Sequence, residues 1–175
     1  MILVPKFNQI VELGGTLAIA HYRDGELFDT RFISNLVTTA GKKWIAARMK
    51  DAGSGQLQMS HMALGGSTTP GALAITSPTV DDTTLTTSGA YAERGRVALT
   101  TAGGTVSGAV VTYNATFNTS TAANCAIVEA GIFNAASGTY AEAGHVNCML
   151  CKTAFQVVNK GANDTIAITW TVTIQ

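Results

Sequence analysis

The clearest periodic pattern in the chain lies between residues 165 and 174. Apolar and small polar residues alternate strictly there, so an extended segment would have one apolar face and one polar face. Threonine, the main polar residue of this segment, suits a pleated and half-buried surface. The pattern predicts a strand with one buried face and a Thr-rich face that is either open to water or covered by another sheet. The apolar positions are Ile166, Ile168, Trp170, Val172 and Ile174, and the others are Thr165, Ala167, Thr169, Thr171 and Thr173.

A period of two recurs along most of the chain. Residues 16–22 and 26–33 flank Asp24-Gly25, a dipeptide that accepts the positive φ angles of a tight turn, and together they predict a β-hairpin. Seven or eight strands with one early helix favour a mainly β fold, an antiparallel β-sandwich of jelly-roll-like form. The further predicted strands span 59–64, 92–101, 105–118, 125–134, 146–158 and 165–174.

One segment has a helical pattern, and one long segment has no pattern. A short helix is predicted near residues 39–51, with Thr38 or Thr39 as its N-cap and Gly53 after its end. Trp44 in this helix and Trp170 in the last strand are both expected to be buried. Residues 65–90 form a polar loop rich in Gly, Ser and Thr, and loops of this length are usually functional or braced by a partner.

The first 15 residues predict an N-terminal arm that precedes a single domain over residues 16–175. Two short apolar runs are ended by Pro5 and by Gly14-Gly15, and neither is long enough for a domain element. Apolar residues so near a terminus must dock to become ordered, either on the chain's own sheet or on another subunit. We predict a protein interface formed by Ile2, Leu3, Val4, Phe7, Ile10, Val11 and Leu13.

The composition narrows the function classes. The chain has 175 residues and a formal net charge of zero, and 13% of its residues are charged, about half the usual share. Binding to nucleic acid needs a cationic excess, and a membrane span needs a long apolar run, so neither partner is expected. A protein with so few charges tends to self-associate. The composition therefore indicates a chain that packs against protein neighbours.

The residues that usually carry chemistry do not form a recognisable site. Cys148 and Cys151 make a C-x-x-C within an apolar strand pattern, and Cys125 is the only other cysteine, so we expect buried free thiols. His21, His61 and His145 lack ligand spacing, and the Gly-Gly pairs lack the Lys-Ser/Thr of a phosphate loop. We expect no catalytic residue, metal or cofactor. Without a visible signal peptide, synthesis is expected in a reducing cytoplasm.

Glu129 is the most conspicuous charge, because it lies within the apolar run Ile127-Val-Glu-Ala-Gly-Ile-Phe133. A buried carboxylate is costly unless it is paired, and Arg94 or Arg96 is the predicted partner. The alternative, a general acid, would need a second catalytic group and a pocket. We therefore predict a structural ion pair and no enzymatic activity.

Four segments resemble small structural proteins of tailed bacteriophages, and the resemblance extends over about residues 36–175. The likeness departs from the usual pattern between Tyr140 and Lys152. The four segments are Asn35-Leu-Val-Thr-Thr-Ala-Gly-Lys-Lys, His61-Met-Ala-Leu-Gly-Gly-Ser-Thr-Thr-Pro, Val128-Glu-Ala-Gly-Ile-Phe-Asn-Ala-Ala-Ser-Gly and Val158-Asn-Lys-Gly-Ala-Asn-Asp-Thr-Ile-Ala-Ile-Thr-Trp-Thr-Val-Thr-Ile.

The resemblance implies a capsid cement (decoration) protein that is made in the bacterial host cytoplasm and lies on the capsid exterior of the virion. Its expected partners are the phage major capsid protein and further copies of itself, in a homotrimer. The alternative is a tail or tail-fibre protein that acts in structure or adsorption. A third reading, a glycan hydrolase, would need two carboxylates across a cleft, and Asp81-Asp82 is the only adjacent acidic pair.

Overall fold

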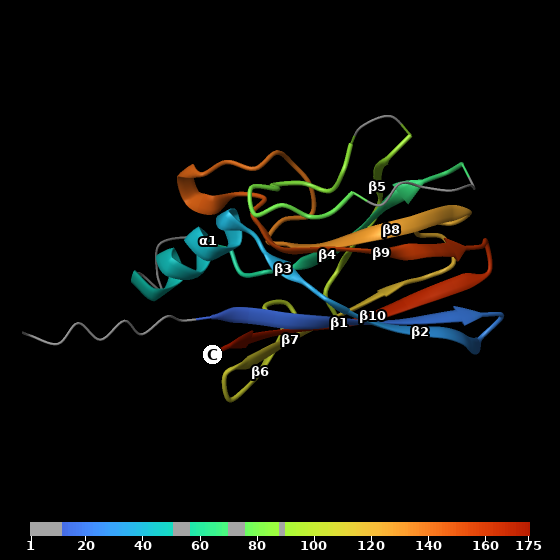
Figure 1. Cartoon of the computed structure of the whole chain (residues 1–175), viewed down its shortest axis with the longest axis horizontal. Helices are drawn as coiled ribbons and strands as arrows, with labels where there is room; N and C mark the ends of the chain where they lie inside the picture. The colour runs from blue at the N-terminus through green and yellow to red at the C-terminus, as the bar shows by residue number, and fades with distance from the viewer. Residues whose placement is uncertain (1–11, 51–56, 70–75, 88–89) are drawn as a thin grey trace, which may run out of the picture.

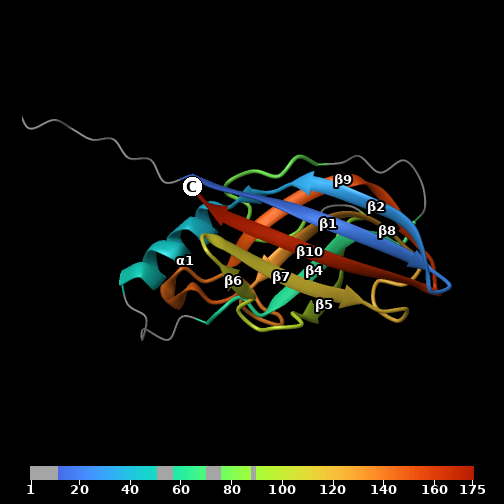
Figure 2. The same ribbon diagram turned by 90° about the horizontal axis from the view of Figure 1, so that it is seen from below.

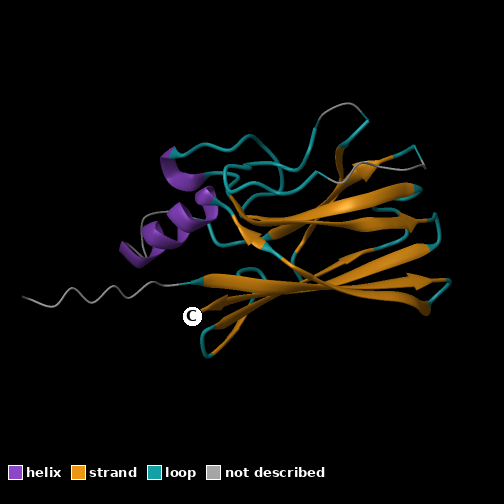
Figure 3. Cartoon of the chain, viewed as in Figure 1, coloured by secondary structure: helices purple, strands orange, loops and turns teal. Residues whose placement is uncertain are grey.

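The chain folds into two antiparallel sheets that pack face to face (Figure 1, Figure 3). The computed structural model describes residues 12–50, 57–69, 76–87 and 90–175, and within these residues each sheet has five strands. One α-helix, α1 (Thr39–Lys50), packs at one end of the sandwich, and a 3₁₀ turn spans Ala143–His145. The predicted mainly β sandwich with one short helix is confirmed.

The first sheet has the strand order β2-β1-β10-β7-β6. β1 and β10 are paired along their full length at its centre, from Leu13 opposite Ile174 to Arg23 opposite Asp164. The predicted hairpin joins β1 to β2, and Gly25 has the expected positive φ of 86°. The strands are β1 (Leu13–Arg23), β2 (Glu26–Ser34), β6 (Thr105–Ser107), β7 (Val110–Phe117) and β10 (Asp164–Ile174).

The second sheet has the order β3-β9-β8-β4-β5. All nine residues of β8 are buried, because its inner face packs on the first sheet and its outer face is covered by residues 76–87. Leu85 of this covering segment packs in a small apolar cluster with Phe133 and Met149. The strands are β3 (Leu36–Val37), β4 (His61–Ser67), β5 (Ala92–Ala98), β8 (Cys125–Phe133) and β9 (Met149–Lys160).

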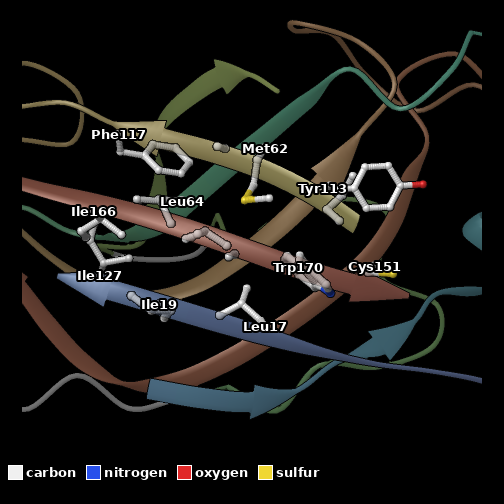
Figure 4. Close-up of a cluster of buried hydrophobic side chains, with 14 of the residues drawn as sticks. Leu17, Ile19, Met62, Leu64, Tyr113, Phe117, Ile127, Cys151, Ile166 and Trp170 are labelled. Carbon is white, nitrogen blue, oxygen red and sulfur yellow. The ribbon is translucent and has the colours of Figure 1, made fainter. Parts of the chain in front are cut away.

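The main hydrophobic core lies between the two sheets. Figure 4 shows Leu17, Ile19 and Trp170 of the first sheet gathered with Leu64 and Ile127 of the second. All five are at most 2% exposed, and burying each such side chain stabilises the fold by about 1.5–3 kcal/mol. The apolar positions Ile166, Ile168, Trp170 and Val172 of the last strand point inward as predicted, whereas Ile174 at its end is 44% exposed.

The helix begins where its sequence predicts. The Gly41 N–H donates to Thr38 Oγ1 at 3.0 Å, which is the expected N-cap, and the Lys42 N–H donates to the Thr38 carbonyl at 2.9 Å. A Cβ at Gly41 would lie 2.3 Å from the Leu150 carbonyl oxygen, so glycine lets α1 pack directly on β9. Trp44 is half-buried and not buried as predicted, because it lines the gap between helix and sandwich.

The strand predicted over 105–118 is two strands in the structure, β6 and β7, and two further boundaries differ from the prediction because glycines permit close approach there. β4 continues through Gly65-Gly66, which look like a turn in the sequence, and a Cβ at Gly66 would lie 2.0 Å from the Ala126 carbonyl oxygen. The predicted arm boundary at residue 15 falls inside β1. Gly15 lies against the Thr171 carbonyl oxygen, where a Cβ would approach to 2.1 Å, so the strand extends back to Leu13.

Candidate functional site

The outer face of the first sheet is an uncharged surface across four strands. Figure 2 looks onto this face, with β2, β1, β10 and β7 side by side. Because side chains alternate and the intervening residues are in the core, three cross-strand rows point outward. The rows are Ser34, Thr16, Thr171 and Thr112; Phe32, Ala18, Thr169 and Asn114; and Thr30, Ala20, Ala167 and Thr116. We call these twelve residues the Thr face.

The polar groups of the Thr face are hydroxyls and one amide, and several of them bond to each other. Thr169 Oγ1 donates to Asn114 Oδ1 at 2.9 Å, and Thr171 Oγ1 donates to the Thr16 carbonyl at 3.2 Å. At the β2 edge Phe32 is 74% exposed. Hydroxyls cost less to desolvate than charges do, so this surface of small hydroxylated side chains with an apolar edge suits contact with a protein better than contact with a charged polymer.

The charged residues of β2 lie off this face. Arg31 and Asp29 form an ion pair at 2.7 Å, and Arg31 also donates to the Gln156 carbonyl of β9. β2 therefore closes one edge of the sandwich with its charges and presents uncharged side chains outward.

Glu129 is buried and paired, but its partner is not one of the two arginines predicted. Glu129 Oε2 lies 3.2 Å from Lys152 Nζ of β9, and both side chains are at most 4% exposed. Arg94 and Arg96 belong to β5, which is separated from β8 by β4, whereas β9 is the direct neighbour of β8. Strands lie about 4.8 Å apart, so Lys152 is one strand spacing from Glu129 and the arginines are two.

The two arginines have other partners. Arg96 binds Glu93 through two hydrogen bonds of 2.9 and 2.7 Å, and its guanidinium lies 3.8 Å from the centre of the Phe133 ring. Arg94 donates to the carbonyls of Gly66 and Ala90. Both side chains therefore fix the outer edge of the second sheet.

The Glu129–Lys152 pair holds the 76–87 segment against the sheet. The Thr86 N–H and hydroxyl donate to the Glu129 carboxylate at 2.6 and 3.0 Å, and Lys152 also pairs with Asp82 at 3.0 Å. Burial opposes ionisation of Asp82, but hydrogen bonds from Thr79 and Lys152 outweigh it and lower the pKa of that carboxyl. Asp81 accepts a hydrogen bond from Thr39 at 3.4 Å. Asp81 and Asp82, the two carboxylates considered for glycan hydrolysis, are thus engaged by side chains of the protein.

A second polar cluster lies at the end of the sandwich that is opposite to α1. His21 Nε2 lies 2.7 Å from Asp164 Oδ2, and the Gly161 N–H donates to the same oxygen at 2.9 Å. Lys160 is 1% exposed, and its Nζ has no hydrogen-bond partner among the described residues. Burial lowers the pKa of Lys160, while the nearby Asp164 opposes that shift. No motif in the sequence predicts this cluster, because His21 and Asp164 are 143 residues apart.

The three cysteines are free and buried. Burial raises the pKa of the Cys148 and Cys151 thiols to about 12, so neither is a nucleophile at neutral pH. His61 contacts Ser60 at 2.8 Å, and burial and the charge of Arg96 lower its pKa. Within the described ranges, no three His, Cys, Asp or Glu side chains are placed to hold a metal ion together.

The predicted arm interface falls mostly outside the described residues. Ile2, Leu3, Val4, Phe7, Ile10 and Val11 all precede Glu12, where the description begins. Leu13, predicted as an arm residue, belongs to β1 and packs partly buried against the core. Among the described helices, none is long and apolar enough to span a membrane.

The sites that the structure brings together are thus an uncharged sheet face, a buried ion pair under a covering segment and a polar end cluster. The chain matches no protein-family model, no curated protein and no solved structure at a significant level.

Proposed function

We propose that this protein is a structural component of a tailed-bacteriophage virion, a cement protein that binds the outside of the assembled major capsid protein shell. The observation that carries this proposal is the Thr face, three rows of four uncharged side chains across β2, β1, β10 and β7. Its hydroxyls can form hydrogen bonds with backbone and side-chain groups of a neighbour, and these bonds offset the cost of removing the hydroxyls from water.

The composition and the sequence resemblance support the same reading. Only 13% of the residues are charged, and this fraction suits a chain whose surfaces are covered in an assembly. The segment that begins at Val128 and the segment that begins at Val158 both resemble phage structural proteins, and they form most of β8, the last three residues of β9 and all of β10. In this proposal the chain contributes binding and mechanical stability and catalyses no reaction.

A cement protein stabilises a shell by mass action, since it binds the assembled state and not the free subunits. Symmetric contacts suit this role, and we propose a homotrimer as the bound form.

The test uses phage shells that lack this protein. Purified full-length chain is added to them, and the bound fraction is measured by sedimentation, followed by the temperature at which the shells rupture. Saturable binding to shells with a raised rupture temperature is the expected result. Isolated tails are assayed in parallel. Binding to tails and not to shells would replace the cement proposal with a tail function, and unchanged rupture would refute stabilisation.

A further inference from the structure

An apolar groove lies at the end of the sandwich where α1 packs. It is bounded by the helix and by the ends of β6, β7 and β10, and it has a volume of about 320 Å³. Two of the side chains at its rim are strongly exposed, Met49 at 84% and Val106 at 71%. The walls and rim include Trp44, Met49, Val106, Val111, Val172 and Ile174. An apolar groove with exposed apolar rims is typical of a surface that receives an apolar segment.

The charged side chain of Arg48 borders the groove, but the groove remains mainly apolar. Arg48 lies over the Trp44 ring, with its guanidinium carbon 5.6 Å from the ring centre. The Trp44 indole N–H donates to the Leu57 carbonyl at 3.0 Å, so its polar atom is already engaged. What the groove offers to a ligand is therefore mainly aliphatic and aromatic surface.

The chain itself carries an apolar segment that begins beside this groove. Glu12 exchanges two backbone hydrogen bonds with Gln175, of 2.8 and 2.9 Å, and the next residue of that ladder, Ile174, lines the groove. The eleven residues before Glu12 include six large apolar side chains besides Met1. They are Ile2, Leu3, Val4, Phe7, Ile10 and Val11.

The reach of this segment favours the groove of another copy. Ile2, Leu3 and Val4 precede Glu12 by eight to ten residues, a span of about 26–33 Å for an extended chain. Ile174, which lines the chain's own groove, is paired with Leu13, so those three residues could enter that groove only if the segment turned back toward its own start. A neighbouring groove can be met without reversal.

We propose that residues 1–11 of one copy occupy the apolar groove between α1 and β6 of a second copy. The contact runs head to tail, from the arm of one subunit to the groove of the next, and it closes into a ring if the rotation between subunits allows. This inference deepens the proposed function, because it supplies the contact between cement subunits, but its test needs only the purified chain.

The test uses two full-length variants with complementary defects. In the arm variant, Leu3→Asp and Phe7→Asp place charges on the inserted segment. In the groove variant, Val106→Asp places a charge at an exposed rim position of the short strand β6, where the core is not disturbed. Val146→Asp, at an exposed valine that does not line the groove, is the matched control.

Sedimentation velocity of each protein and of mixtures gives the result. The parent and Val146→Asp should form the same oligomer, and the arm and groove variants should each sediment as monomers. An equimolar mixture of the two defective variants should form a pair of twice the monomer mass, because one variant retains a working groove and the other a working arm.

Three outcomes would overturn the inference. The groove variant or the arm variant could associate like the parent, which would place the contact elsewhere. The mixture could remain monomeric while the parent associates. The parent could be monomeric at every concentration, which would place the arm in its own groove or on another protein. An intact oligomer that fails to bind shells would instead contradict the proposed function and leave this contact standing.

Discussion

Glu129 and Lys152 form an ion pair of 3.2 Å on the outer face of the second sheet, beneath the segment that contains Thr86. The two residues lie on adjacent strands, and Gly65 on β4 is directly opposite Glu129. Since a Cβ at Gly65 would lie 2.4 Å from Glu129 Oε1, the missing side chain provides the space that the carboxylate occupies. The pair thus depends on three neighbouring strands and on the segment that covers them.

Replacing Glu129 should destabilise the fold. Glu129→Ala is expected to lower the free energy of unfolding by about 3 kcal/mol, because Lys152 would remain buried with the more exposed Asp82 as its one carboxylate partner among the described residues. Urea denaturation measures the change. The double variant Glu129→Leu/Lys152→Met removes both charges and should lose less stability than Glu129→Ala alone. A single variant with the parent's midpoint would show that the pair is dispensable.

Gly66, at which β4 and β8 approach each other closely, should not tolerate a methyl group. Gly66→Ala is expected to cost about 1–3 kcal/mol or more, because its Cβ would lie 2.0 Å from the Ala126 carbonyl oxygen and backbone must move. Gly14→Ala, also in a strand but with no heavy atom within 4 Å of the added Cβ, should change stability little. Thermal unfolding of both variants checks the contrast, and equal losses would contradict the close packing.

Acid should weaken the end of the sandwich that contains Asp164. Burial raises the pKa of this carboxyl, but the Gly161 N–H, His21 and Arg23 outweigh burial, so its pKa in the folded protein lies below the ordinary value. A lowered carboxyl pKa contributes stability above the unfolded pKa of about 3.9, and that contribution is lost as the pH falls further.

Asp164→Asn should therefore be less stable than the parent at pH 7 and should lose less stability between pH 5 and pH 2. Urea unfolding across this range gives both quantities. The titratable and charged groups nearest the carboxyl, His21, Arg23 and Lys160, are unchanged in the variant. Stability curves that run parallel for parent and variant would contradict a lowered pKa.

The cysteines should be unreactive in the native protein. With a thiol pKa of about 12, about one Cys148 or Cys151 side chain in ten thousand is ionised at pH 8. Both side chains are also fully enclosed. A thiol reagent that gives a coloured product should therefore react slowly with the folded chain. In urea it should react with all three cysteines. Rapid native reaction would place a thiol at the surface.

A charge in the centre of the Thr face should weaken binding to shells. Thr169→Lys introduces an ammonium among uncharged rows without touching the core, so its fold should be intact while its affinity for shells falls at least tenfold. Ser137→Lys, at an exposed turn outside this face, is the charge-matched control and should bind like the parent. Equal affinity of the two variants would remove the Thr face from the interface.

The parts of the fold that follow from short-range patterns could be predicted from the sequence. The alternation after Asp164 and the turn at Asp24-Gly25 define strands, and the Thr38 cap defines the helix, because each depends on residues within a few positions of one another. The Thr face also follows from that alternation. Only the residues that β10 contributes to it could be recognised before the strand order was known.

The contacts that depend on strand order could not be predicted. The choice between Lys152 and the arginines of β5 as the partner of Glu129 is decided by which strand lies next to β8. Gly65-Gly66 has the composition of a turn, and only the approach of β8 shows that the pair lies within a strand. The cluster of His21 and Asp164 likewise arises because β1 and β10 are paired.

The pairing of β1 with β10 also determines the stage of chain synthesis at which the Thr face can form. Its rows join residues of β1 to residues of β10, which lie far apart along the chain, with a sequence separation of 155 between the hydrogen-bonded Thr16 and Thr171. A nascent chain that has not yet reached β10 lacks the middle of this sheet, and pairings of such long sequence separation form slowly. The surface proposed to bind the shell therefore forms only after β10 has been synthesised, and a chain interrupted before β10 cannot present it.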